Sequence, residues 1–292
     1  MRRLLLCLVV GATAVAGCGG GGDDAEGLTV VASFYPLAEA AARIGGPDVR
    51  VRNLTPAGSE PHDLELTPDQ VDAVEDADVV LYVGGGFQPA VQEVAERRGE
   101  GAVDLLTALP PEEREGDDAD PHFWLDPTLL ARAVGAVEQA LAAADPAAAG
   151  GFEARAGDYR SQLGRLDEEL RAALAPCPRR DIVTSHAAFH YLARRYDLVQ
   201  VPIAGLSPGA EPDPARLSDL VDLIEERGVT TVFYETLVSP DVAETLAREA
   251  GVDAAVLDPI EGLSQDDAEA GADYATVMRR NLDALRRALG CA

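Results

Sequence analysis

The chain has 292 residues and a formal charge of −27, because 24 lysine and arginine residues stand against 51 aspartate and glutamate residues. A protein this acidic repels phosphate backbones, which excludes nucleic acid as a partner. Apolar residues make up 47% of the chain and charged residues 26%, a composition that indicates a folded globule and not a disordered tail.

The N-terminal segment is predicted to be a targeting signal. A basic start, Met1-Arg2-Arg3, precedes the apolar run LLLCLVVGATAVA, which is shorter than the roughly 20 residues of a membrane span but typical of a secretory signal. The run ends in VAGC, which resembles a bacterial lipobox, so we expect a signal peptide over 1–17 and a lipid on Cys18. An ordinary signal with a chance cysteine is the alternative. The glycine-rich, acidic segment 18–27 indicates a flexible tether that leaves the mature protein extracytoplasmic and anchored to the cell membrane.

Strands and helices alternate after the tether. Apolar and β-branched runs predict strands over 28–34, 49–54, 78–84 and 102–106. Helical patterns predict helices from Pro36, over 68–76 and over 88–98. This alternation favours a parallel sheet flanked by helices, which forms an N-terminal α/β lobe over 28–145.

The second half of the chain repeats this order. Strands are predicted over 181–185, 198–203, 229–234 and 253–257, and helices over 187–196, 214–227 and 240–250. The fold class is therefore α/β, with a second parallel-sheet lobe over 177–292.

A long helix is predicted between the two lobes. Apolar residues recur every three or four positions from Phe152 to Leu174, which places them on one helix face about 35 Å long. Pro146 and Pro176 lie near its two ends, so the linking segment is 146–176. A single helix of this length favours small tilts of the lobes over wide hinge opening.

The cysteines beyond the tether form one pair. Cys177 and Cys291 are expected in an oxidising compartment, which favours a disulfide, while two buried free thiols are the alternative. Neither has a second cysteine nearby, which argues against a thiolate metal site.

Three of the four histidines follow predicted strands. His62 and His122 lie in loops of the first lobe, and His186 comes directly after the strand over 181–185. Asp258 follows the last strand of the second lobe, and ligands of open α/β sheets gather at such strand ends. Three imidazoles and one carboxylate would make a four-coordinate site for a divalent ion.

Each loop histidine has a less specific interpretation as a solvated surface residue, and only their joint placement favours a site. His190 lies four residues after His186, but the pair lacks the glutamate of the H-E-x-x-H metalloprotease motif. We therefore interpret His190 as a helix-surface or lobe-packing residue.

Several segments resemble a known family in sequence and order. They are VVASFYPLA, PHDLELTP, DPHFWLDP, TSHAAFHYLARRYDL, GLSPGAEPDPARL, VFYETLVSP and VLDPIEGL. The chain resembles the metal-binding lipoproteins of cluster A-I, the solute-binding subunits of zinc and manganese ABC importers. The resemblance implies two sheet lobes joined by one long helix, metal ligands at His62, His122, His186 and Asp258, and a monomer that delivers its ion to an ABC permease at the cytoplasmic membrane.

The sequence departs from the family in one segment. Zinc members often carry a histidine-rich loop before the second ligand, but the segment over 110–121 is short, acidic and free of histidine. We interpret it as a solvated charge run that draws cations toward the cleft.

The nitrogen-rich ligand set favours Zn²⁺ over Mn²⁺, which prefers oxygen ligands and is the alternative cargo. Glu60 and Glu235 are candidate acceptors for imidazole N–H groups, and Glu60 is also an alternative to Asp258 as the fourth ligand. Four protein ligands fit a carrier, not an enzyme, because a catalytic zinc keeps an open position for water. A zinc-dependent hydrolase and an adhesin with a structural metal are the alternatives from other classes.

Overall fold

The computed structural model describes residues 27–114, 120–209 and 213–291. The predicted signal peptide over 1–17, the lipidated Cys18 and all but the last residue of the tether over 18–27 lie outside the described residues, as does part of the acidic segment over 110–121. Within the described ranges, no helix combines the length and the apolar character needed to cross a membrane.

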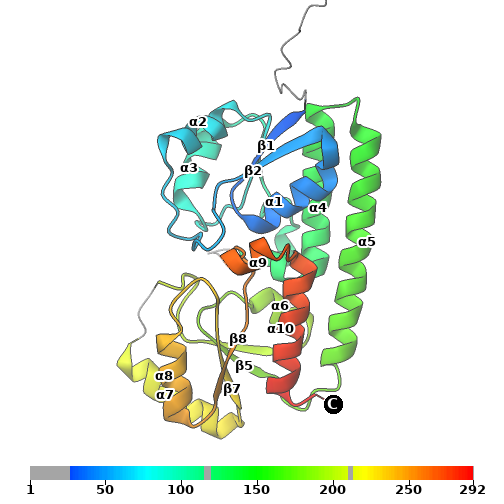
Figure 1. Ribbon diagram of the computed structural model, residues 1–292. Helices are drawn as coiled ribbons and strands as arrows, with labels where there is room; N and C mark the ends of the chain where they lie inside the picture. The colour runs from blue at the N-terminus through cyan, green and yellow to red at the C-terminus, as the bar shows by residue number, and fades with distance from the viewer. Residues whose placement is uncertain (1–26, 115–119, 210–212, 292) are drawn as a thin grey trace, which may run out of the picture.

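The first lobe is a four-stranded sheet covered by helices (Figure 1). Its strands are β1 (Leu28–Ala32), β2 (Val49–Asn53), β3 (Val79–Tyr82) and β4 (Ala102–Asp104). Its helices are α1 (Tyr35–Gly45), α2 (Pro68–Asp76) and α3 (Pro89–Arg98). Each begins with a proline in its first turn, where the missing backbone N–H leaves no helix hydrogen bond unmade.

The second lobe has the same alternation. Its strands are β5 (Asp181–Thr184), β6 (Val199–Pro202), β7 (Thr231–Tyr234) and β8 (Asp253–Val256). Its helices are α6 (His190–Arg195), α7 (Pro214–Arg227) and α8 (Asp241–Ala250). Helix α6 begins three residues later than the sequence predicts, because the segment after β5 is an irregular loop that carries His186.

Four further helices and three short turns complete the described part of the chain. They are α4 (Pro127–Ala144), α5 (Ala149–Leu174), α9 (Gln265–Glu269) and α10 (Tyr274–Leu289), with short 3₁₀ turns η1 (Gly46–Asp48), η2 (Pro111–Glu113) and η3 (Phe123–Leu125). Helix α5 is the predicted linking helix, and it runs along both lobes (Figure 1). At 1.5 Å per residue it is about 39 Å long.

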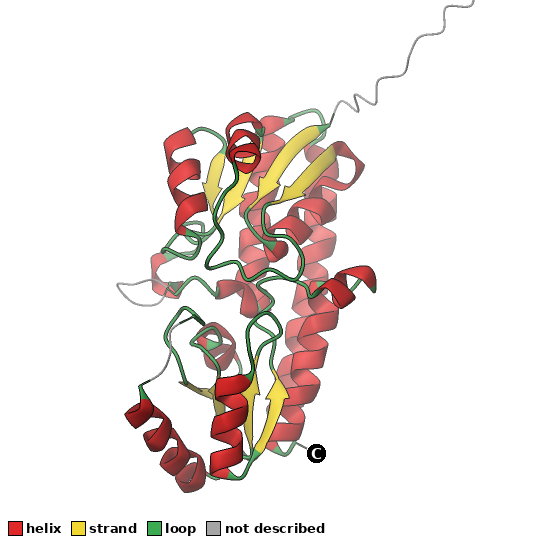
Figure 2. Ribbon diagram, turned by 60° about the vertical axis from the view of Figure 1, so that its left-hand side comes forward, coloured by secondary structure: helices red, strands yellow, loops and turns green. Residues whose placement is uncertain are grey.

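Both sheets are parallel and have equivalent strand orders, β2-β1-β3-β4 and β6-β5-β7-β8. Figure 2 shows the arrowheads of the two sheets pointing toward the middle of the molecule. The loops that follow the strands of both lobes therefore meet between the lobes. The fold class predicted from the sequence is confirmed.

The largest apolar core crosses from one lobe to the other. It contains Val30 and Leu81 of the first sheet together with Ile182 and Phe233 of the second. The apolar face of α5 belongs to the same core, from Phe152 to Leu174. Separating the lobes would expose this shared core, so the packing agrees with the expectation of small tilts, which stays a prediction. The boundaries over 28–145, 146–176 and 177–292 stay predictions. The shared core contains residues from all three segments, so it does not mark where one lobe ends and the next begins.

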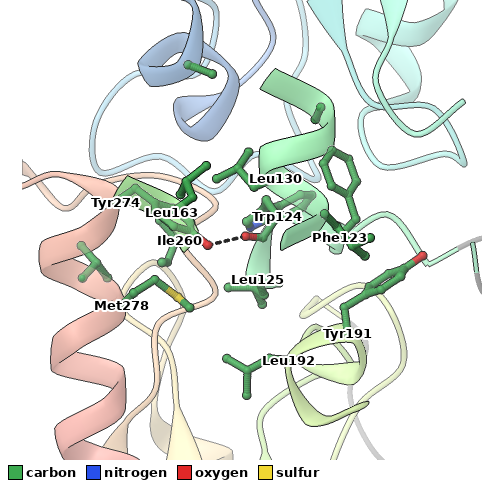
Figure 3. Packing of buried hydrophobic residues seen from close by; sticks show 14 of the residues in the cluster. Phe123, Trp124, Leu125, Leu130, Leu163, Tyr191, Leu192, Ile260, Tyr274 and Met278 are labelled. Atoms are coloured by element: carbon green, nitrogen blue, oxygen red, sulfur yellow. Dashed lines mark hydrogen bonds between the residues drawn. The ribbon is translucent and has the colours of Figure 1, made fainter. Parts of the chain in front are cut away.

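The C-terminal helix also joins the two lobes. Tyr274, the first residue of α10, donates its hydroxyl to the carbonyl of Trp124 at 2.6 Å (Figure 3). Asp273, which caps α10, forms an ion pair with Arg43 of α1 at 2.7 Å. At the other end of α10, Cys291 is joined to Cys177 by a disulfide. Helix α10 is thus fixed to the first lobe at its start and to the end of α5 at its finish.

Candidate metal centre

Three histidines and one glutamate converge between the lobes. His62 follows β2, His122 lies between β4 and α4, His186 follows β5, and Glu261 follows β8. One ligand atom from each of these side chains lies within 4.8 Å of all the others. The group therefore takes two residues from each lobe.

The three imidazoles face one carboxylate oxygen. Oε1 of Glu261 lies 3.2 Å from Nε2 of His122, 3.3 Å from Nε2 of His186 and 3.5 Å from Nε2 of His62. In a tetrahedral zinc site with bonds of about 2.0–2.1 Å, neighbouring ligand atoms lie about 3.3 Å apart. The spacing around Oε1 therefore matches the edges of a zinc tetrahedron.

The centre is buried and polar. His122 and His186 are fully buried, Glu261 is 1% exposed, and the side chain of His62 is 8% exposed. In the described part of the chain, Nε2 of His62 and Nε2 of His122 are among the few buried polar atoms without a hydrogen bond. Buried polar atoms are rarely left unpaired, so these lone pairs are suited to an ion. The exposure of His62 places the open side of the centre at that residue.

Carboxylates orient two of the rings. Nδ1 of His122 lies 2.6 Å from Oδ1 of Asp120, and Nδ1 of His186 lies 2.9 Å from Oε1 of Glu235. A carboxylate on Nδ1 favours the tautomer that leaves Nε2 free to bind a metal. The sequence analysis gave Glu235 as a candidate acceptor for an imidazole N–H, and the structure places it against the His186 ring. The sequence analysis placed Asp120 in a solvated charge run over 110–121, which is wrong for this residue, because it is 6% exposed and contacts His122 two positions on in DPH.

The other two predicted carboxylates lie outside the cluster. Glu60 accepts the backbone N–H of His62 at 3.0 Å and that of Asp63 at 3.2 Å, so it holds the His62 loop and not the ring. Asp258 accepts the N–H of Ile260 at 2.7 Å and the hydroxyl of Thr236 at 2.9 Å. Here the structure departs from the predicted ligand set, because Glu261 and not Asp258 stands among the imidazoles.

The carboxylates change the protonation of the centre. Burial lowers the pKa of His186, but its contacts with Glu235 and Glu261 outweigh burial and raise the pKa to about 10. The pKa of His122 is also raised, because contacts with Asp120 and Glu261 outweigh burial. Burial would raise the pKa of Glu261, yet the three imidazoles hold it well below its ordinary value. The metal-free centre therefore holds a proton on His186 at neutral pH.

Zinc binding at pH 7.5 is expected to release at least one proton from the centre. A metal binds neutral imidazole, and His186, with a pKa of about 10, is protonated at this pH in the metal-free protein. Zinc affinity should consequently fall as the pH falls from about 10, by about tenfold per pH unit for each proton displaced. Calorimetry in two buffers of different ionisation enthalpy measures the number released. An enthalpy that is the same in both buffers would contradict the expected protonation.

Two similar sheet lobes with a buried imidazole and carboxylate cluster at their junction define a two-lobe metal-binding protein. The family model described as "Zinc-uptake complex component A periplasmic" matches residues 30–288. The chain belongs to this family, which confirms the resemblance seen in the sequence motifs.

Curated relatives and a solved structure agree with this assignment. The chain is 33% identical over 277 residues to the zinc-binding lipoprotein AdcA of Streptococcus pneumoniae, covering 89% of this chain and 55% of that protein. It is 34% identical over 298 residues to the high-affinity zinc uptake system protein ZnuA of Bacillus subtilis, covering 94% and 93% of the two chains. The Zn(II)-bound ZnuA-like domain of S. pneumoniae AdcA is 34% identical with a TM-score of 0.79, covering 90% of this chain and 99% of that one. The chain spans about half the length of the AdcA relatives.

Proposed function

We propose that this chain is an extracytoplasmic solute-binding protein that captures Zn²⁺ between its lobes and delivers it to an ABC importer permease. The observation that carries the proposal is the approach of three Nε2 atoms to one oxygen of the buried Glu261. The family match and the zinc proteins similar to this chain support it. Three nitrogen ligands and one oxygen ligand suit Zn²⁺ better than Mn²⁺, which remains the alternative cargo.

The proposed ligands are His62, His122, His186 and Glu261. Four protein ligands fill a tetrahedral zinc site, whereas a hydrolase needs a position for water and a general base beside it. The nearby carboxylates of Asp120 and Glu235 are bound to ring Nδ1 atoms instead. A closed site of this kind favours carriage of the ion over catalysis.

The anchoring proposal rests on the sequence. We propose that residues 1–17 are removed, that Cys18 carries lipid and that the tether over 18–27 holds a monomeric protein at the cell membrane. A tethered carrier remains close to a permease in the same membrane, which raises the effective concentration of the two partners.

Glu261→Gln and Asp258→Asn together test the ligand set. Each substitution removes one charge and keeps the shape of the side chain. Glu261→Gln is expected to lower zinc affinity about 100-fold, because apparent zinc-site free energies of about 10–16 kcal/mol are shared by four ligands. Asp258→Asn should lower zinc affinity by less than about tenfold, because its amide oxygen can still accept the Ile260 N–H. A residue that does not bind the metal itself affects the affinity only through the ligands it orients.

Competitive titration against a zinc chelator measures both variants. Elemental analysis of the parent protein, purified without chelator, shows whether one zinc is bound per chain. Parent protein that binds no zinc would refute the carrier proposal. A larger loss in Asp258→Asn than in Glu261→Gln would restore Asp258 as the fourth ligand.

A further inference from the structure

The turn that carries Glu261 has an unusual backbone. Ile260, directly before Glu261, has a φ of 56°, one of two positive φ values among the described non-glycine residues. A β-branched residue is rarely found in this left-handed region, because its side chain crowds the backbone. Ile260 is also fully buried. Such conformations persist only where the surroundings impose them.

Side chains from three parts of the chain hold this turn. Oδ1 of Asp258 accepts the N–H of Ile260 at 2.7 Å. The Asn281 amide on α10 pairs with both backbone groups of Asp258, accepting its N–H at 2.8 Å and donating to its carbonyl at 2.6 Å. Trp124 donates its indole N–H to the carbonyl of Pro259 at 2.8 Å. The peptide groups that lead into Glu261 are thus fixed one after another by side-chain hydrogen bonds.

Of the three side chains that bond the Ile260 turn, Trp124 is the one that comes from the first lobe. It lies in η3, two residues after His122, and its ring centroid is 5.2 Å from that of His122. Its ring is fully buried against Phe34 and Phe87, with centroids 4.7 and 5.2 Å away. Figure 3 shows Trp124 beside Ile260, with its carbonyl bound by Tyr274. One rigid side chain therefore joins the loop of His122 to the loop of Glu261.

We propose that Trp124 is a positioning residue for zinc capture, whose indole N–H holds the Ile260 turn so that Glu261 faces the three imidazoles. The proposal rests on the zinc-binding function proposed above. Without the indole donor, the Pro259 carbonyl loses its partner and the turn can relax toward ordinary backbone angles. Glu261 would then leave the position that completes the tetrahedron, while the three imidazoles would stay in place.

A double-mutant cycle tests whether Trp124 acts through Glu261. Trp124→Phe removes the donor and keeps an aromatic ring in the core. We expect it to lower zinc affinity about 10- to 100-fold, the range found when groups that orient a ligand are removed. In a Glu261→Ala background the same substitution should change zinc affinity by less than about twofold, since the carboxylate it positions is already absent.

Two further variants keep the test decisive. Tyr196→Phe removes another buried donor, the hydroxyl that contacts Asp167 at 3.2 Å, and should leave zinc affinity unchanged. If Trp124→Phe does not fold, Asn281→Ala loosens the same turn from α10 and should show the same dependence on Glu261. Melting of the metal-free variants shows which of them fold.

The outcomes separate this proposal from the proposed function. The positioning role is supported if Trp124→Phe lowers zinc affinity in the parent background but not in the Glu261→Ala background. Parental affinity in Trp124→Phe, or an equal loss in both backgrounds, overturns that role while zinc binding itself stands. Parent protein that binds no zinc refutes the carrier function, and the positioning role with it.

Discussion

Substituting His122 with alanine is expected to lower zinc affinity about 100- to 1,000-fold, because one of four ligand bonds is lost from a site worth about 10–16 kcal/mol. His122 is fully buried and its ring is held by Asp120, so the substitution removes a ligand that the parent protein keeps in place. Competitive titration with a chromogenic chelator measures the loss. Circular dichroism of the variant checks that the sheets are intact.

His190→Ala is the matched control for this substitution. His190 is an exposed residue at the start of α6 and is not part of the cluster of ligand atoms. Its removal should change zinc affinity by less than about twofold, as expected of a surface residue away from the site. A loss comparable to that of His122→Ala would place His190 in the centre and overturn the ligand assignment.

Saturating zinc is expected to raise the melting temperature by about 8–16 °C relative to EDTA-treated protein. An ion that binds only the folded state adds about 4 kcal/mol when its free concentration is 1,000 times the Kd. For a domain of roughly this size, each kcal/mol shifts the melting temperature by about 2–4 °C. Scanning calorimetry at pH 7.5 with and without zinc measures the shift.

The His122→Ala variant serves as the reference for this stabilisation. At the same zinc concentration its melting temperature should rise far less, since the concentration then exceeds the Kd by a much smaller factor. Equal stabilisation of parent and variant would mean that zinc acts elsewhere on the folded protein.

Much of the fold could be predicted because local pattern and final structure agree. The helices over 68–76 and 214–227 were predicted with the bounds that the structure shows, since proline and a capping side chain mark the start of each. The buried strands β3 and β5 were evident as apolar runs. The placement of His62, His122 and His186 followed from one rule, that ligands gather at the carboxyl ends of parallel strands.

The fourth carboxylate could not be predicted from pattern. Asp258 and Glu261 both follow β8, so their distance from a strand end does not distinguish them. Between these two carboxylates lies Ile260, whose left-handed backbone sets the direction in which the chain leads into Glu261. A β-branched residue disfavours this conformation, so the sequence does not indicate it. The turn is bonded by residues far along the chain, since Trp124 contacts Pro259 across 135 positions and Asn281 contacts Asp258 across 23.

The second missed residue has a different cause. Asp120 reaches the His122 ring from a loop without regular structure, so no periodicity indicates where its side chain points. The sequence DPH was the available signal, because an acid two residues before a histidine can accept both its backbone N–H and its ring N–H.

The central claim is that His62, His122, His186 and Glu261 bind one zinc ion between the lobes. A crystal structure of the zinc-loaded protein, with anomalous scattering recorded on both sides of the zinc absorption edge, tests it most directly. The account predicts one strong anomalous peak between the lobes, about 2.0–2.1 Å from the three Nε2 atoms and about 2.0–2.2 Å from an oxygen of Glu261. A peak bound by Asp258 in place of Glu261, or located away from the three imidazoles, would contradict it.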